Sequence, residues 1–406
     1  MVYEPYGSIY PVSLWHKRAC FDKSSYFDGG NDMYPIRDLL IPVLVLSILG
    51  YQTLTSLPIA IGALIDYRGF LLGNVGLVGT LELLGMAISA TLASTFLDKI
   101  NVKKIAPLAM LALSISQCVA AFTLDETLFL IERFFVGLSA GLLTAILARV
   151  VATAISPERL TALAILSVSG FGIIVYLFFP ILTARGGVAY VYLVLSGLSL
   201  LGIFGLRGLP DLQPTKKSES KALNNDFILL ILFSLSFGVV SAAMWTFSER
   251  IGLSSGLSKE EIGYILAVGT FFGITGAAIA AIIGDKFGSF IPILLATSCL
   301  LLAGIFIPQT TVPSAFALIF ILFRFAQNFN DPFIIGVIAR RDGEGRLLSL
   351  NAGAGLFGSA LGPSVASYVI GNEGAYDKLS IMYGIGAIMA FAFFFLFLFY
   401  PQLTRK

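Results

Sequence analysis

Residues 128–159 read LFLIERFFVGLSAGLLTAILARVVATAISPER. Most of this stretch is an apolar run long enough to cross a bilayer as a helix, which takes about 20 residues. Glu132 and Arg133 lie roughly one helical turn inside its start, where a charge is costly unless it has a partner or faces water. Gly137 and Gly141 follow at helical spacing and would let another helix approach closely. A membrane helix with a buried arginine beside small residues is typical of a transporter or a channel.

The composition is that of an integral membrane protein. Of the 406 residues, 57% are hydrophobic and 12% are charged, and the mean hydropathy is +0.90. A soluble protein carries about 25% charged residues. The net charge of +2 comes from lysines and arginines spread through short loops, which gives no indication of nucleic-acid binding. His16 is the single histidine, and the three cysteines are too scattered for a metal site or a disulfide framework. We therefore expect no metal and no cofactor.

Apolar spans follow one another from Leu39 to the end of the chain. They cover residues 39–63, 74–97, 105–123, 128–150, 160–182, 187–206, 227–248, 261–283, 290–308, 314–338, 347–370 and 380–400. The one long break, residues 207–226, contains prolines, serines and lysines without periodicity and predicts a linker. We predict an all-α integral membrane protein of twelve transmembrane helices, in two six-helix bundles over residues 39–206 and 227–400.

The lysines and arginines predict the orientation. With the N-terminus inside, the inner segments hold 19 of the 26 basic residues and the outer loops hold 5, while Arg133 and Arg324 lie within spans. Because basic residues favour the cytoplasmic side, we expect a multi-pass protein of the cell membrane with both termini and the linker in the cytoplasm. Residues 1–38 contain no apolar core of a cleavable signal. They predict a disordered tail, with two alternatives: a start of translation at Met33, or a functional tail. Residues 401–406 form a short C-terminal tail.

The two halves are copies of one another. Three features recur at an offset of 187 residues and a fourth at 191: Val75-Gly76 with Ile262-Gly263, Asp98-Lys99 with Asp285-Lys286, Arg159 with Arg346, and Arg133 with Arg324. One such match would be chance, but four in register indicate a duplication. Parallel six-helix repeats are a known transporter architecture, in which the substrate lies between the halves near the midplane.

Two short motifs carry a family resemblance. Residues 94–104 read STFLDKINVKK, where the family pattern is Gly-x-x-x-Asp-Arg-x-Gly-x-Arg/Lys; Asp98, Lys99 and Lys103 fit it, and Ser94 and Asn101 replace the glycines. Arg133-x-x-x-Gly137 is similar to the pattern of the fourth helix. The chain thus resembles the major facilitator superfamily, over residues 39–400.

The resemblance implies a secondary transporter that works by rocking of its two halves. It also implies a conformational latch at the cytoplasmic helix ends, which would form in one state and break in the other. The residues expected in this latch are Asp98, Lys99, Lys103, Asp285 and Lys286. In many members the arginine equivalent to Arg133 is associated with proton coupling.

Glu82 and Arg133 are predicted to form an ion pair. Their positions in the second and fourth spans place them at depths that differ by roughly 5 Å. Burial disfavours the charged carboxylate and the arginine favours it, so a proton exchanged at this pair is the simplest coupling device. As an alternative, the pair only fixes the packing of the helices. Glu132 is an alternative titrating group, although it could also simply reach the outer interface.

The tenth span carries a polar stripe of four side chains at i, i+3, i+4 and i+7, namely Arg324, Gln327, Asn328 and Asp331. The resemblance implies that the first, fourth, seventh and tenth helices line a central cavity, so we expect the stripe to face it. Arg324 would suit an anionic substrate group or a carboxylate of the other half. For Asp331, a gating or capping role is as well supported as a place in the cavity.

Other polar residues give weaker indications. Tyr51 and Gln52 on the first span are candidates for the cavity, although contact between helices explains them equally well. Trp245 and Glu249 could form an outer gate, but an aromatic side chain at an interface is ordinary in a membrane protein. Residues 258–261, SKEE, predict a capping box at the start of the eighth span.

We therefore predict a monomeric secondary transporter for a small organic solute such as a drug, a metabolite or an organic anion. Proton coupling is expected, and resemblance favours export slightly over uptake by symport. The chain has no Gly-x-x-x-x-Gly-Lys-Ser/Thr phosphate loop, so ATP is not the expected energy source. Alternatives on the same scaffold are a lipid flippase and a non-transporting sensor. We expect no enzyme activity and no catalytic residues, because no catalytic constellation is recognisable.

Overall fold

The chain folds into long helices in a computed structural model that describes residues 33–97, 100–210, 225–284, 286, 288–341 and 346–403. The α-helices are α1 (Ile36–Arg68), α2 (Gly76–Phe96), α3 (Val102–Phe122), α4 (Glu126–Ala152), α5 (Pro157–Gly205), α6 (Asn225–Ser254), α7 (Lys259–Ile283), α8 (Phe290–Phe306), α9 (Pro313–Arg341), α10 (Arg346–Ile370) and α11 (Lys378–Leu403). Short 3₁₀ turns, η2 (Leu206–Gly208) and η3 (Ile307–Gln309), follow α5 and α8. The all-helical membrane fold predicted from the sequence is confirmed.

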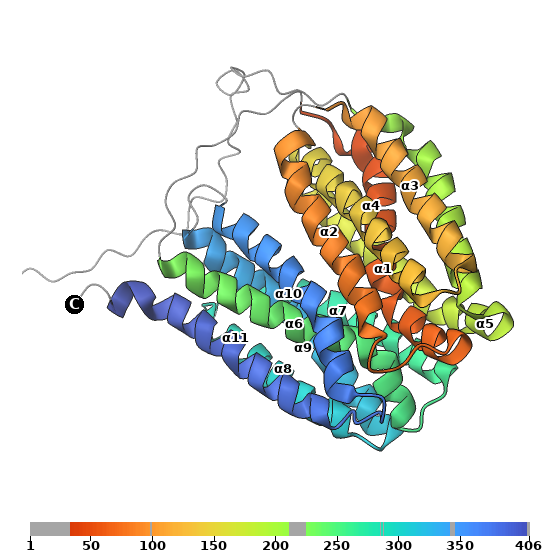
Figure 1. Cartoon of the computed structure of the whole chain (residues 1–406). Coiled ribbons are helices and arrows are strands. Elements are labelled where there is room, and N and C mark those ends of the chain that lie inside the picture. The colour runs from red at the N-terminus through yellow and green to blue at the C-terminus, as the bar shows by residue number, and fades with distance from the viewer. Residues whose placement is uncertain are drawn as a thin grey trace, which may run out of the picture.

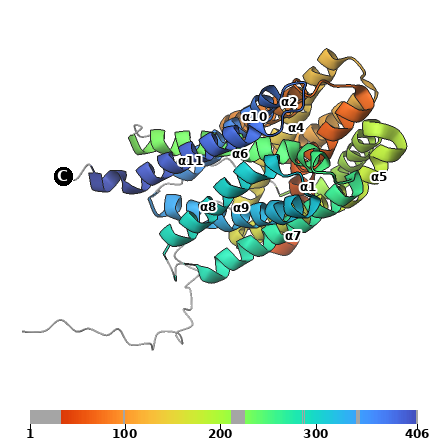
Figure 2. The ribbon, with the colours of Figure 1, turned by 90° about the horizontal axis from the view of Figure 1, so that it is seen from below.

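The helices form two bundles, α1–α5 and α6–α11 (Figure 1). In the first bundle α2 packs on α4 and α1 packs on α5, and in the second α7 packs on α9 and α6 packs on α10. Seen from below, α7 runs beside α9, and α6 runs beside α11 (Figure 2). The helix pairs of the first bundle thus recur in the second, as a duplication requires.

Helix α5 contains two of the predicted spans. Its 49 residues are interrupted at Gly186 and Gly187, and Gly187 has a φ of 62°, which favours glycine. Leu160 near the start of α5 and Leu206 just after its end share one apolar cluster with Leu39. The two arms therefore form a hairpin, as the predicted break between residues 182 and 187 requires.

Ten of the described helices are long and apolar enough to cross a membrane. The hairpin α5 counts as one of these ten, although it supplies two crossings. Helix α9 is 29 residues long but is not among the ten, because the polar stripe lowers its hydropathy. The described helices are therefore consistent with twelve crossings.

The helix ends differ from the predicted spans by a few residues. Helix α1 begins at Ile36, three residues earlier than predicted, and Tyr34 pairs with the end of α4, accepting a hydrogen bond from Ile155 N–H at 3.0 Å. The end of the predicted tail therefore packs on the first bundle, and its residues 1–32 lie outside the described part of the chain. The capping box at Ser258 and Glu261 is present as predicted.

The two bundles meet at one end and separate toward the other (Figure 1). Hydrogen bonds and ion pairs between described residues join the two bundles in one half of the molecule only. This half contains the ends of α1 and α6 and the starts of α2 and α7. We call this end, where α1 and α6 stop and α2 and α7 start, the closed end. The opposite end, where α1 and α6 begin, we call the open end.

Two close backbone contacts hold the closed end. A Cβ on Gly76 of α2 would lie 2.1 Å from the carbonyl oxygen of Pro363 on α10, and a Cβ on Gly263 of α7 would lie 2.4 Å from that of Tyr176 on α5. Each residue of the first contact is related to one of the second by 187 positions. The duplication noted in the sequence is therefore visible in the interface, which repeats one contact with pseudo-twofold symmetry.

Hydroxyl groups fasten the contact between α2 and α10. The N–H of Gly76 donates to Ser367 Oγ at 3.1 Å, and the hydroxyl oxygens of Thr80 and Ser364 lie 2.7 Å apart. Both bonds cross between the bundles.

We expect Gly76→Ala to open this interface. The new methyl group would meet a backbone carbonyl, which cannot move aside as a flexible side chain can. Such overpacking costs about 1–3 kcal/mol, which would lower the closed population by about fivefold or more. The measurement is the rate of disulfide cross-linking between Thr80→Cys and Ser364→Cys, in a chain whose own cysteines are replaced.

Gly263→Ala is expected to have the same effect on this cross-link, because it blocks the symmetry-related contact. The control is Gly197→Ala, where nothing lies within 4 Å of the added methyl group. A cross-linking rate that Gly76→Ala leaves at the control value would contradict the importance of the contact.

Candidate functional site

A cavity of ≈ 280 Å³ lies between the two bundles. Its wall combines residues of both halves, namely Leu54, Thr55, Leu83, Val168, Ser169, Gly172, Tyr176, Ser241, Ala242, Trp245, Thr270, Arg324, Gln327, Leu356 and Ser359. Helices α1, α6 and α9 line it, as expected for the first, seventh and tenth spans. The expectation for the fourth span is wrong in this conformation, since α4 contributes no lining residue and α2, α5, α7 and α10 do.

Arg324 is the one side chain of this wall that carries a permanent charge. Its guanidinium carbon lies 4.7 Å from the centre of the Trp245 ring, and its Nη1 donates to Gln327 Oε1 at 2.7 Å. Its stem packs over Gly269 of α7, where a Cβ would lie 3.2 Å from Arg324 Cγ. The aromatic ring and the amide therefore hold the guanidinium in place at the cavity wall.

Trp245 and Tyr176 separate the cavity from the closed end. The indole N–H of Trp245 donates across the interface to the Leu54 carbonyl oxygen at 3.0 Å. The hydroxyl of Tyr176 donates to the Thr55 carbonyl oxygen at 3.0 Å, and the two rings meet edge to face at 5.7 Å. Trp245, predicted as a weak outer gate, thus lies at the contact of three helices and touches the charged residue of the cavity.

The polar stripe of α9 divides between two surroundings. Arg324 and Gln327 line the cavity, and Gln327 donates to Ser241 Oγ at 3.4 Å. Asn328 instead packs on α7, where its Nδ2 lies 2.2 Å from the Cβ position of Gly273. Asp331 is half-buried and is not among the lining residues. The predicted place in the cavity therefore fits Arg324 and Gln327, and it does not fit Asn328 and Asp331.

The two candidates on α1 do not line the cavity. Gln52 is fully buried and donates to Ser199 Oγ of α5 at 2.8 Å, inside the first bundle. Tyr51 packs beside the cavity against the cluster formed by Leu83, Met86 and Ala242. Helix contact, the alternative considered for both residues, is what the geometry supports.

Glu82 and Arg133 come together inside the first bundle. Arg133 Nη1 lies 3.8 Å from Glu82 Oε2, and the two side chains are 1% and 7% exposed, respectively. The pair is possible because the backbones nearly touch: a Cβ on Gly137 would lie 1.9 Å from the Glu82 carbonyl oxygen. Arg133 also donates to Gln117 Oε1 at 3.1 Å and lies 4.6 Å from the Tyr192 ring centre.

This ion pair faces the interior of the bundle and not the cavity. Arg133 is held by partners inside the bundle, since Glu82, aromatic rings and Gln117 surround it. Gln117, on α3, is a direct partner of the arginine. Leu83, the residue after Glu82, does line the cavity. Helix α2 therefore connects the pair to the cavity wall.

Glu132 points away from the pair. Its Oε1 accepts a hydrogen bond from Thr123 Oγ1 at 2.7 Å, at the end of α3, and its side chain is half-buried. Arg68 lies in the same region and donates to the carbonyl oxygens of Ala121 and Thr123. Of the two carboxylates considered in the sequence, Glu82 is the one that pairs with Arg133.

A cluster of four charged residues spans the two bundles at the closed end. Arg250 donates to both carboxylate oxygens of Asp66, at 2.9 and 2.7 Å, and Lys259 Nζ lies 2.6 Å from Asp66 Oδ2. Glu249 lies beside them, with Oε2 2.8 Å from Arg250 Nε. Two acids and two bases balance one another, which is how charges are tolerated at a membrane interface.

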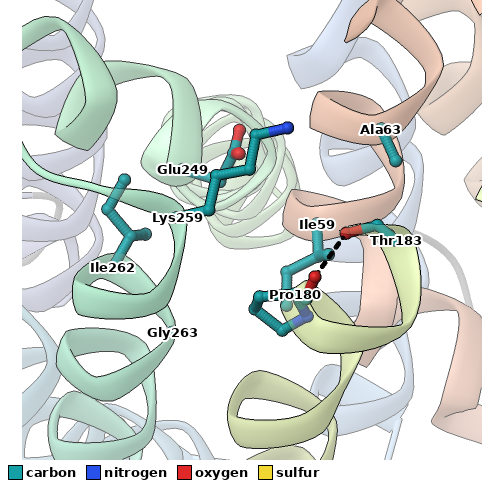
Figure 3. A pocket seen from close by; sticks show the side chains of 8 residues that line it. All are labelled: Ile59, Ala63, Pro180, Thr183, Glu249, Lys259, Ile262 and Gly263. Atoms are coloured by element: carbon teal, nitrogen blue, oxygen red, sulfur yellow. Dashed lines mark hydrogen bonds between the residues drawn. The ribbon is translucent and has the colours of Figure 1, made fainter. Parts of the chain in front are cut away.

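Glu249 is buried by the first bundle. A Cβ on Gly62 of α1 would lie 2.3 Å from Glu249 Oε2, and the side chain is 5% exposed. Figure 3 shows Glu249 and Lys259 facing Ile59, Pro180 and Thr183 across a small pocket. The pocket holds ≈ 10 Å³, about the space of one water molecule. Glu249, predicted with Trp245 as an outer gate, thus lies in the closed interface.

Sequence reasoning missed Asp66, Lys259 and Tyr176. The two charged residues stand at helix ends, where a charge is ordinarily solvated, and nothing in their local pattern predicts a partner about 190 residues away. Tyr176 lies in an apolar run, where an aromatic residue predicts only burial.

The predicted latch falls largely outside the described residues. Asp98, Lys99 and Asp285 are not among them, and Lys103 and Lys286 are exposed at the open end. The latch therefore stays a prediction.

The geometry defines a class of protein: a helical membrane protein of two repeated bundles, with one cavity between them that is sealed at one end. The Major Facilitator Superfamily model matches residues 40–343, and the chain belongs to this family of transporters. No curated protein sequence matches the chain.

Solved structures of transporters share the fold. A bacterial homologue of the human lysosomal transporter Spinster, in an inward-facing and unoccupied conformation, is 14% identical, with 89% of this chain and 96% of that chain covered and a TM-score of 0.69. The nucleoside transporter NupG is 13% identical, with 87% and 98% covered and a TM-score of 0.69. A D-xylose–proton symporter is 15% identical, with 89% and 98% covered and a TM-score of 0.69.

We expect Glu82→Gln to destabilise the first bundle, because it leaves the Arg133 charge buried without its carboxylate. Removing one partner of a buried pair costs about 3–5 kcal/mol. The double variant Glu82→Gln/Arg133→Gln removes both charges and is expected to regain part of this loss. The melting temperature of the purified protein measures the loss of stability in the single variant and its partial recovery in the double variant. Glu132→Gln is the matched control, and equal melting temperatures for the single and the double variant would contradict the ion pair.

Proposed function

We propose that the chain is a secondary active transporter that moves a small organic solute by alternating access. The observation that supports this best is the cavity, which both bundles line and which the closed end seals on one side. A rocking motion that breaks the closed-end contacts would expose the same cavity to the other side. The predicted orientation, with both termini in the cytoplasm of a cell, makes the open end the cytoplasmic one.

The closed end has the properties of a reversible contact. Beside apolar residues of both bundles that share one buried cluster, it contains two glycine–carbonyl contacts, hydroxyl bonds and the charged cluster around Asp66. Water can replace the partners of these hydrogen bonds and ion pairs when the bundles separate.

We further propose that protons drive the transport through Glu82. A carboxylate beside a buried arginine changes its interaction with that arginine when it takes up a proton. Helix α2 carries Glu82, the cavity residue Leu83 and the interface residues Gly76 and Thr80. A change at the ion pair can therefore act on the cavity and on the closed end through one rigid helix. Glu132 is the second candidate for this role.

Export is the direction we favour, on family resemblance. Uptake by proton symport is the alternative, and one of the similar solved structures is a D-xylose–proton symporter. We propose that the protein works as a monomer, since the cavity is complete within one chain.

Proton flux into proteoliposomes that contain a pH-sensitive dye tests the coupling. A panel of organic acids, cations and neutral solutes is applied to the wild type, Glu82→Gln and Glu132→Gln. We expect at least one solute to drive a proton flux that Glu82→Gln abolishes and Glu132→Gln retains. A flux unchanged in Glu82→Gln would contradict its role, and solute movement without protons would contradict proton coupling but not transport.

A further inference from the structure

We propose that the central cavity binds a small organic anion, with the anionic group on the Arg324 guanidinium and an apolar body on the opposite wall. This inference rests on the proposed transport function and names its substrate class. Four observations support it: the charge of the wall, the unused donors of Arg324, the apolar surface of the rest of the wall, and the volume.

The wall of the cavity carries one positive charge and no negative charge. None of its residues is an aspartate or a glutamate. Among the described residues, no carboxylate forms a salt bridge with Arg324. Asp331, two turns further along α9, interacts with it electrostatically over a longer distance. The charged groups at the closed end, Asp66, Glu249, Arg250 and Lys259, balance one another within one cluster.

Arg324 has donors that the protein does not use. A guanidinium presents five N–H donors. One of them bonds Gln327, and the buried Nε has no acceptor. By contrast, Arg250 binds Asp66 with two nitrogens and the Gly62 carbonyl oxygen as well. An arginine in a membrane protein that lacks a carboxylate partner is costly, and a planar anion such as a carboxylate would supply the missing acceptors.

The rest of the cavity wall presents mostly apolar surface. Leu54, Leu83, Val168 and Leu356 supply aliphatic surface, while Ser169 and Ser359 add hydroxyl groups. A cation would be repelled by Arg324, and a fully hydrophilic anion would leave the leucines in contact with polar groups. The lining therefore selects an amphipathic anion.

The cavity volume limits the size of the solute. At ≈ 280 Å³ the space is at the lower end of the range of about 300–1,000 Å³ for ligand pockets. A carboxylate on a single ring or on a short alkyl chain fits this limit.

Trp245 joins the proposed anion site to the seal of the cavity. It stacks on Arg324 and donates to the Leu54 carbonyl oxygen of the other bundle. An anion on Arg324 would weaken its attraction to the indole ring. Occupancy of the site is thus expected to change the surroundings of Trp245.

The chain contains two tryptophans, and Trp15 can be removed by Trp15→Phe. The fluorescence of the full chain then reports on Trp245 alone. We would titrate this protein in lipid nanodiscs with three pairs of probes: phenylacetate and phenylacetamide, cyclohexanecarboxylate and cyclohexanecarboxamide, and hexanoate and hexanamide. Phenethylammonium serves as the cationic probe.

We expect at least one carboxylate to bind about tenfold or more tightly than its amide, the ratio that a hydrogen bond to a charged group supplies. Arg324→Gln is expected to abolish this preference, and Arg324→Lys to retain part of it. Arg185→Gln is the control, because it removes a positive charge from an exposed position outside the cavity. The comparison of acid with amide needs no substitution at Arg324, so it remains decisive even where Arg324→Gln does not fold.

Three results would overturn the proposal: amides that bind as tightly as their acids, phenethylammonium that binds more tightly than every carboxylate, or no carboxylate that changes the fluorescence up to millimolar concentration. None of these results would contradict transport itself. Cross-linking between Thr80→Cys and Ser364→Cys in the same nanodiscs reports whether the closed end opens, and it does not depend on the solute. A closed end that never opens would contradict the proposed function instead.

Discussion

The contact between Gly76 and the carbonyl oxygen of Pro363 sets how closely α2 can approach α10. Its counterpart, Gly263 against the carbonyl oxygen of Tyr176, does the same for α7 and α5. No side chain larger than hydrogen fits at either glycine without a shift of the backbone. The hydroxyl bonds of Thr80 and Ser367, the indole bond of Trp245 and the volume of the cavity all depend on this approach. Because the two contacts are repeats of one another, the bundles meet symmetrically around the cavity.

Charges inside the two bundles are distributed in three different ways. Glu82 and Arg133 pair within the first bundle, where they connect α2 to α4. Asp66 and Arg250, with their neighbours, balance across the closed end. Arg324 stands at the cavity wall, where it forms no salt bridge with a carboxylate of the described residues. A charge in a membrane protein is costly wherever it lies, so each arrangement indicates a role: positioning of helices, fastening of the bundles, and recognition of the solute.

Much of this arrangement could be predicted from the sequence. Hydropathy and the repeat at 187 residues predict the two bundles, and the depths of Glu82 and Arg133 predict their pairing. For Gln52 the sequence left the cavity and a helix contact open, and Asn328 was expected in the cavity but packs on α7. A helical pattern gives the residues that share a face but not the neighbour that the face meets. Asp66 was missed for a different reason, since its partners Arg250 and Lys259 belong to the other bundle. Pairing between bundles depends on the conformation, which local sequence patterns do not encode.

In the proposed transport cycle the two bundles rock about the cavity, so that one end closes as the other opens. Distances between spin labels test it most directly, with one pair at Leu124 and Val312 on the closed end and another at Lys103 and Lys286 on the open end. Asp66→Asn, which weakens the charged cluster, is compared with Glu373→Gln, an exposed carboxylate at the same end. If the bundles rock, Asp66→Asn populates a longer distance at the closed end together with a shorter one at the open end. A closed end that widens while the open end stays unchanged would contradict it.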